Sequence, residues 1–209
     1  AEVLSIPRLG FLGYHPTKLP RNRGRHPIIW TLVLGLGETA STFFFMDEGA
    51  DTGDILSQRS VPVTHEDNAR SLYDRLMQVA DNQIRTFAPQ LAANQFSRTP
   101  QDDAKANTWR KRTKTDGEID WRMSASSIYN LVRALTHPYP GAHCIANSRE
   151  VKLWKSQIVS EQFNDISHLE SGKVLESTKE RVCVKCGSGV LALTVHDFKD
   201  LPDVNTYLQ

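Results

Sequence analysis

The chain has 209 residues, of which 39% are hydrophobic and 23% are charged, which is typical of one large globular domain or one domain plus a smaller module. No apolar run reaches the roughly 18–20 residues of a membrane span, and no signal-peptide pattern opens the sequence, so we expect a cytoplasmic protein without membrane contact. The net charge is +1, with 10 basic against 10 acidic residues in 1–99 and 15 against 14 in 100–209, whereas nonspecific nucleic-acid binding usually needs a basic excess.

The first hundred residues alternate between strand-like and helical patterns. Apolar segments, the later two richer in β-branched or aromatic residues, predict strands at residues 9–13, 39–46 and 55–63. Helices are predicted at 28–36, after Pro27, and at 67–91, where Leu72, Leu76, Val79 and Ile84 fall near one face. Two polar loops remain between these elements. We call residues 14–26 the histidine loop and the glycine-containing residues 47–54 (DEGADTGD) the acidic loop.

The second half begins with a polar stretch of little periodicity and then becomes rich in short strands. A helix is predicted at 125–135, and short strands are predicted at 142–146, 151–159, 172–177, 182–186 and 190–195. We therefore expect an α/β fold in which a partial Rossmann-like sheet is followed by a small β-rich, open-barrel-like module. The expected boundaries are 1–97 for the first domain, 98–116 for a linker and 117–209 for the second domain.

Two side chains with complementary chemistry follow predicted strands of the first domain. His15 comes after the strand 9–13, and Asp51 comes after the strand 39–46. In a doubly wound sheet, ligands collect at the carboxyl ends of strands, so neighbouring strands would bring both side chains into one crevice. A carboxylate beside an imidazole fixes the ring and allows it to move a proton. Taken singly, His15 is more often a solvated residue and Asp51 a turn former.

The residues around these two side chains form a longer pattern. Residues 15–24 (HPTKLPRNRG), 27–28 (PI) and 46–55 (MDEGADTGDI) resemble the signature of the 10-formyltetrahydrofolate-dependent formyltransferases. That family includes methionyl-tRNA formyltransferase, glycinamide ribonucleotide formyltransferase and the sugar N-formyltransferases. In the second half, residues 109–112 (WRKR), 116–121 (DGEIDW), 128–135 (IYNLVRAL) and 138–142 (PYPGA) resemble the start of the family's carboxy-terminal module.

The resemblance implies transfer of a formyl group from 10-formyltetrahydrofolate, the co-substrate, to a primary amine. It places His15 and Asp51 in the catalytic positions. It also places the pterin ring of the co-substrate against the loop Met46, Asp47, Glu48, Gly49, Ala50 and Asp51. Residues of the other loop are assigned to substrate binding: Tyr14, Thr17 and Arg23.

The sequence departs from the family at two points. The family's asparagine, which donates a hydrogen bond to the formyl oxygen, lies two residues before the histidine, and this position is Gly13. A backbone N–H, a water or the Tyr14 hydroxyl would have to substitute, or the chain is a non-catalytic folate- or sugar-binding relative. The family also has several strand–helix units before the histidine loop, so we expect a fragment or an amino-terminal half that is supplied separately.

The acceptor that the sequence favours is a nucleotide-linked amino sugar, because residues 129–142 most resemble the amino-sugar formyltransferases. Arg21, Arg23 and Arg25 are then candidates to neutralise the diphosphate or the folate tail. Transfer RNA is the less favoured acceptor because of the charge balance, although the basic run 109–112 is either a phosphate contact or a solvated linker. A homodimer stays open.

The three cysteines do not predict a metal site. Cys183 and Cys186 have the spacing of half a zinc site, but a second pair is missing and the only other thiol is Cys144. We interpret these positions as small apolar side chains packed in strands.

Overall fold

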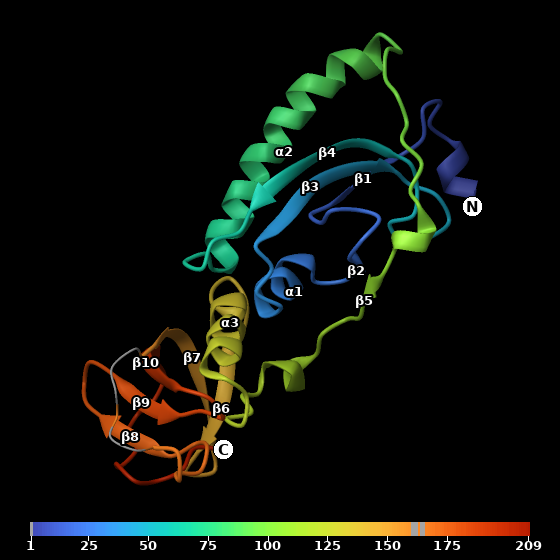
Figure 1. Cartoon of the computed structure of the whole chain (residues 1–209). Helices are drawn as coiled ribbons and strands as arrows, with labels where there is room; N and C mark the ends of the chain where they lie inside the picture. The colour runs from blue at the N-terminus through green and yellow to red at the C-terminus, as the bar shows by residue number, and fades with distance from the viewer. Residues whose placement is uncertain (1, 160–162, 164–165) are drawn as a thin grey trace. The chain divides into compact units, whose positions relative to one another are not determined.

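In a computed structural model, residues 2–159, 163 and 166–209 are described, and the chain divides into two compact units (Figure 1). The first unit comprises Ala1–Thr31, Leu36–Asp67 and Ser71–Arg112. The second comprises Leu32–Gly35, Asn68–Arg70 and Thr113–Gln209. The predicted class, an α/β first part followed by a β-rich module, is confirmed. The predicted domain boundaries stay a prediction.

The first unit is built on a three-stranded sheet of β1 (Leu12–His15), β3 (Glu38–Phe45) and β4 (Ile55–Pro62), in the order β1-β3-β4. Both pairings are antiparallel, so the expectation that ligand-binding loops follow neighbouring parallel strands was wrong for this pair. The strand expected at 9–13 begins later and contains His15. The reason is a turn in which Gly10 takes a φ of 88° and its N–H donates to the Pro7 carbonyl.

Helix α2 (Ala69–Ala92) covers one face of this sheet (Figure 1). Phe43 of β3 packs with Ala80 and Phe87 of the helix, and Tyr14 of β1 joins this cluster. The predicted core positions Leu72 and Leu76 are fully buried, but Ile84 is 45% exposed. An α-helix has 3.6 residues per turn. The buried face of α2 therefore runs from Leu76 to Ala80 and Phe87, and Ile84 lies outside it.

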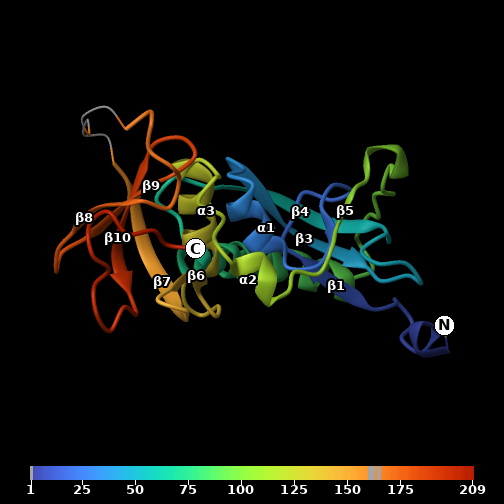
Figure 2. The ribbon, with the colours of Figure 1, turned by 90° about the horizontal axis from the view of Figure 1, so that it is seen from below.

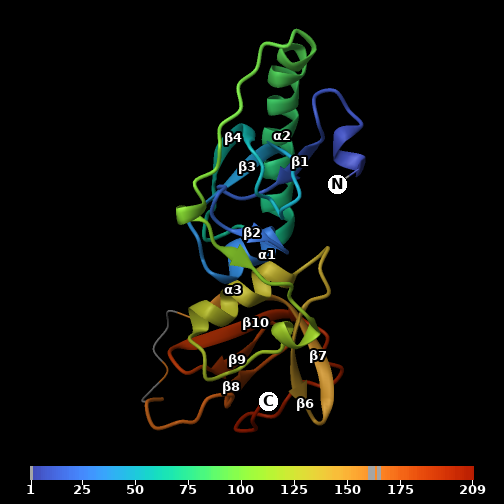
Figure 3. The same ribbon diagram turned by 90° about the vertical axis from the view of Figure 1, so that its right-hand side faces the viewer.

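The rest of the first unit is formed by the histidine loop and by chain that follows α2. Helix α1 (Pro27–Val33) stands where a helix was predicted, and strand β2 (Arg23–Gly24) pairs in parallel with β5 (Thr108–Trp109) (Figure 3). The short 3-10 helices η1 (Glu2–Ser5) and η2 (Asp103–Lys105) also lie in the first unit, whereas η3 (Lys114–Gly117) belongs to the second unit. Residues of the expected polar linker up to Arg112 group with the first unit, and the bounds of this linker stay a prediction.

The second unit is a five-stranded antiparallel sheet with one helix (Figure 2). The helix α3 (Ala125–Leu135) packs on β7, and its amino terminus is capped by the Ser124 side chain. The strand order is β6-β7-β10-β9-β8, with bounds β6 (Ala142–Ala146), β7 (Arg149–Ile158), β8 (Val174–Ser177), β9 (Val182–Lys185) and β10 (Val190–His196). Each predicted strand is present. Among the described residues, no helix combines the length and apolar character needed to cross a membrane.

Candidate active site

His15 is the last residue of β1 and is 5% exposed. Its ring has a defined partner on each nitrogen. Nε2 lies 2.8 Å from the carbonyl oxygen of Asn22, and because a carbonyl only accepts, Nε2 is the donor. Nδ1 lies 3.6 Å from Oδ2 of Asp51. The ring is thus held between the histidine loop and the acidic loop, with its second nitrogen turned towards a carboxylate.

Asp51 reaches His15 from the loop between β3 and β4. This loop starts beside Leu12, at the far end of β1 from His15, and folds back along the strand. Asp51 has a φ of 58°, in the left-handed region that non-glycine residues seldom occupy. Its Oδ2 accepts a 2.8 Å hydrogen bond from the Gly24 N–H. The two residues that we expected to pair therefore do lie together, although the antiparallel strands alone would not have brought them together.

The acidic loop offers an open surface beside this pair. Met46, Asp47, Glu48, Gly49 and Ala50 are all exposed. The loop is nevertheless ordered by its own hydrogen bonds, since Asp47 Oδ1 accepts from the Gly49 N–H at 3.0 Å and from the Thr52 hydroxyl at 2.5 Å. The loop therefore combines exposed side chains with a backbone that hydrogen bonds hold in place. The binding roles of these residues remain predictions.

The three predicted substrate-binding residues make contacts inside the first unit. Tyr14 points to the α2 face of the sheet, because successive residues of a strand face opposite sides, and its hydroxyl accepts a 3.2 Å hydrogen bond from Ser41. Burial raises the pKa of Tyr14. Thr17 is fully buried, and its hydroxyl donates to the Arg21 carbonyl. These side-chain contacts do not involve the His15–Asp51 pair, although the Thr17 N–H donates to the His15 carbonyl at 2.9 Å, and the assigned role of both residues stays a prediction.

Arg23 is also buried, with two partners in the segment after α2. Its guanidinium donates to Gln101 Oε1 from Nε at 3.2 Å and from Nη2 at 2.9 Å, and Nη2 lies 2.8 Å from Asp103 Oδ1. The neighbouring Arg21 and Arg25 are exposed. Two of the three arginines that we expected to bind an anion, Arg21 and Arg25, are therefore exposed. The guanidinium of the third, Arg23, is bonded to residues of its own unit.

Gln101 is a residue of the site that the sequence did not single out. Its Nε2 donates to the Asp51 carbonyl at 2.9 Å and to the Gly53 carbonyl at 2.7 Å. The surrounding residues are polar and without periodicity, which favoured a linker interpretation. Thr99, two residues before Gln101, forms an isolated bridge with Ile55, and this pairing is seen in the fold and not in the local sequence.

Gly13 lies on the same face of β1 as His15, two residues before it, and pairs with Phe44 of β3. The buried Phe44 ring occupies the volume where a side chain at residue 13 would begin. The family's asparagine position is therefore filled from the neighbouring strand.

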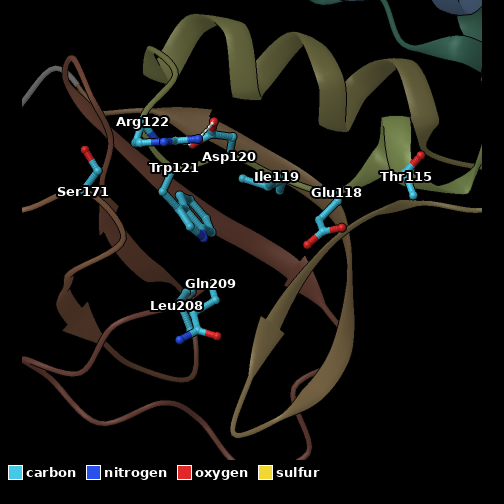
Figure 4. A pocket seen from close by; sticks show the side chains of 9 residues that line it. All are labelled: Thr115, Glu118, Ile119, Asp120, Trp121, Arg122, Ser171, Leu208 and Gln209. Atoms are coloured by element: carbon cyan, nitrogen blue, oxygen red, sulfur yellow. Dashed lines mark hydrogen bonds and ion pairs between the residues drawn. The ribbon is translucent and has the colours of Figure 1, made fainter.

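The pocket of the second unit and the cysteines contain none of the predicted site residues. A pocket in the second unit is lined by Trp121 and by residues around it, namely Thr115, Glu118, Ile119, Asp120, Arg122, Ser171, Leu208 and Gln209 (Figure 4). In the part of the chain that the structure describes, no group of three or more His, Cys, Asp or Glu side chains could hold a metal ion. Cys144, Cys183 and Cys186 are all buried, and none of them forms a disulfide.

Two family models match the chain and together cover most of it. Residues 1–86 match the model described as formyl transferase, and residues 111–206 match the model described as formyl transferase, C-terminal domain.

Solved structures share the fold. WlaRD, a sugar 3N-formyl transferase crystallised in the presence of dTDP and 5-N-formyl-THF, is 20% identical with a TM-score of 0.69, and the match covers 88% of this chain and 65% of that one. An N-formyltransferase from Helicobacter canadensis, in complex with folinic acid and dTDP-3-aminofucose, is 19% identical with the same TM-score and coverage. A methionyl-tRNA formyltransferase from Clostridium thermocellum is 22% identical with a TM-score of 0.63, covering 72% of this chain and 64% of that one. The chain thus spans about two thirds of the length of these proteins.

Proposed function

The chain belongs to the formyl transferase family, and we propose that it carries the reacting groups for formyl transfer from 10-formyltetrahydrofolate to a primary amine. The observation that carries this proposal is the contact between His15 and Asp51, with Nδ1 and Oδ2 3.6 Å apart beside the exposed rim of the acidic loop. The pair thus combines a buried imidazole with a partly buried carboxylate beside an exposed loop, and this arrangement supports binding of the flat co-substrate there.

The reaction forms one C–N bond and breaks another. The acceptor amine attacks the formyl carbon, and the resulting tetrahedral intermediate carries an oxyanion until the bond to the folate nitrogen breaks. His15 stabilises the oxyanion by hydrogen bonding and relays the proton of the amine to the departing folate nitrogen. To reach the reacting atoms, the ring exchanges the Asn22 carbonyl for the substrate and keeps Asp51 on Nδ1. Holding both reactants in one place supplies several further kcal/mol of barrier reduction.

The acceptor that we propose is a nucleotide-linked amino sugar. One structural relative with this fold is a sugar 3N-formyl transferase crystallised in the presence of dTDP and 5-N-formyl-THF, and another was crystallised with folinic acid and dTDP-3-aminofucose. Arg21 and Arg25 are exposed on the histidine loop, and their exposure supports a role in neutralising the diphosphate or the folate tail. The even charge balance of the second half gives no support to an acceptor as acidic as transfer RNA.

A second candidate is a relative that binds folate or sugar without turnover. It is favoured by the position of Phe44, whose ring takes the space of the family's asparagine side chain and leaves no amide donor for the formyl oxygen. Loss of one such donor lowers the rate by roughly 10²–10³-fold in enzymes of acyl transfer.

One experiment separates these candidates. The full-length protein is incubated with 10-formyltetrahydrofolate and a panel of dTDP-linked 3-amino and 4-amino sugars, with methionyl-tRNA as a further acceptor, and products are identified by mass spectrometry. Formylation of an amino sugar supports the proposal. If no acceptor is formylated but 5-formyltetrahydrofolate binds in calorimetry, the non-catalytic candidate is correct. Absence of both turnover and folate binding would contradict both.

A further inference from the structure

The side chain of Gln101 connects the two loops that form the site. At one end, its amide nitrogen donates to the carbonyl oxygens of Asp51 and Gly53, at 2.9 and 2.7 Å. At the other end, its amide oxygen accepts both hydrogen bonds from the Arg23 guanidinium. Arg23 directly precedes Gly24, whose N–H donates to the Asp51 carboxylate. The Gln101 side chain therefore holds the backbone of Asp51 next to β2, and the Gly24 N–H of β2 binds the Asp51 carboxylate.

Asp51 needs such support because of its backbone conformation. With a φ of 58°, it occupies the left-handed region, which Asp adopts more readily than most residues with a side chain but still less readily than Gly. A strained residue keeps such a conformation only when its surroundings fix it. Two contacts do so here: the Gly24 N–H on the carboxylate and the Gln101 amide on the carbonyl. Without the second contact, the Gly24 N–H still binds the carboxylate, but the backbone of Asp51 loses the bond on its carbonyl, and we expect the carboxylate to be held less closely to His15.

The chemistry of this contact requires an amide. The two carbonyl oxygens need donors, and the Arg23 guanidinium needs an acceptor, so a side chain must present NH₂ at one corner and oxygen at the other. Glutamate at position 101 would keep the acceptor for Arg23 but would turn an oxygen towards the two carbonyls. The exchange of glutamine for glutamate therefore removes one half of the contact and retains the other.

We propose that Gln101 is a positioning residue for the reaction, acting through Asp51 on His15. It lies in residues 87–110, which neither family model covers. The expected effect of Gln101 on the reaction rate rests on the proposed function. Its expected effect on the geometry of His15 and Asp51 does not.

The kinetic test compares Gln101→Glu with Asp102→Asn in the full-length protein. Asp102 is a matched control because it is adjacent, and its side chain contacts Ala104 N–H and Lys105 rather than either loop. We expect Gln101→Glu to lower kcat by 10- to 100-fold with KM changed less than threefold, and Asp102→Asn to keep wild-type values. A kcat within twofold of wild type, or a change confined to melting temperature, would overturn the proposal.

A spectroscopic readout separates failure of the inference from failure of the proposed function. The ring ¹⁵N shifts of His15 report which nitrogen carries a proton and what each faces. We expect Gln101→Glu and Gln101→Leu to shift the Nδ1 signal in the same direction as Asp51→Asn, while Asp102→Asn leaves it unchanged. If the wild-type protein transfers no formyl group, the proposed function fails and this comparison still decides the positioning role. Signals at the wild-type position in both folded Gln101 variants would refute it.

Discussion

Gly13 and Phe44 are directly paired across β1 and β3, and the ring of Phe44 leaves no room for a side chain on Gly13. A Cβ atom on Gly13 would lie 2.6 Å from Cζ of Phe44 and 2.8 Å from Cε1. Phe44 is only 4% exposed, so its ring has no open space to turn into. The glycine at the family's asparagine position is thus matched to a large neighbour, and restoring the amide requires changing both residues.

We expect Gly13→Asn alone to destabilise the protein by about 1–3 kcal/mol through overpacking and to bring no gain in formyl transfer. Phe44→Leu removes both ring atoms that obstruct residue 13. The double variant Gly13→Asn/Phe44→Leu should therefore accept the amide and raise kcat/KM by about tenfold or more over wild type, because an added oxyanion donor acts on the transition state. Thermal melts and steady-state kinetics measure the two effects.

Phe44→Leu alone serves as the control and should leave kcat/KM near the wild-type value. The interpretation depends on coupling between the two positions. If Gly13→Asn alone is as stable and as active as the double variant, the Phe44 ring does not restrict this site.

The sequence predicted the elements of the second unit closely. The helix at 125–135 and the strand at 142–146 coincide with α3 and β6. Local signals explain this result, because Ser124 caps the helix and Pro138 and Pro140 follow it within a few residues. Short strands separated by turns depend little on distant residues for their bounds.

The site was predicted in part, and the missing part depends on contacts between distant residues. His15 and Asp51 were found because their loops carry a family pattern, but the antiparallel pairing of their strands is not encoded in either segment alone. Gln101 lies 50 residues from Asp51, and nothing in its polar surroundings indicates a buried contact. The Phe44 ring beside Gly13 likewise follows from strand register, which a single sequence does not reveal.

The pair His15 and Asp51 should act as one unit. We expect His15→Ala and Asp51→Asn each to lower kcat by about 10²–10⁴-fold, and the double variant to be little worse than either single one. Asp51→Asn retains an oxygen for the Gly24 N–H, so the fold should survive. Asp81→Asn, which removes a surface ion pair with Arg85, is the control with unchanged turnover. Additive losses, or near wild-type turnover in either single variant, would show that the assigned roles are wrong.

The arginines of the histidine loop should separate into two classes. Replacing exposed Arg21 and Arg25 with Gln should raise KM for the anionic substrate several-fold at low salt, with a smaller effect at high salt, because exposed charges are screened. Arg23→Lys should instead lower stability by about 1–3 kcal/mol, since one ammonium cannot reproduce the fork that binds Gln101 and Asp103. Denaturant unfolding and salt-dependent kinetics test both parts. Equal effects of all three changes on KM would contradict this division.

Asp67 should make the stability of the first unit dependent on acid. Burial alone would raise the pKa of its carboxyl, but hydrogen bonds from Arg75, the Thr64 N–H and the Ser71 hydroxyl outweigh it and hold the pKa well below the ordinary value of 3.8. A lowered pKa in the folded state means that stabilisation is complete above the unfolded value and is lost as pH falls towards the folded value.

We therefore expect Asp67→Asn to destabilise the protein by roughly 2–3 kcal/mol at pH 7, and by progressively less as the pH falls below about 4. Urea unfolding across this pH range gives the difference directly. Asp81→Asn, at an exposed ion pair, should show almost no change at any of these pH values. A penalty for Asp67→Asn that is independent of pH would mean that its carboxylate charge is not what stabilises this region.

The cysteines should behave as packed apolar residues and not as ligands. Burial raises the pKa of Cys144 and of Cys186 to about 12, so both stay protonated at neutral pH, and a thiolate is what either a metal or a disulfide reagent requires. We expect Ellman's reagent at pH 7.5 to label no native thiol in the folded protein and to label all of them in guanidinium. Ser126→Cys, at an exposed position of α3, is the positive control and should react at once. Zinc that stays bound through dialysis, or a melting temperature that falls when a chelator is added, would instead favour a metal site at Cys183 and Cys186.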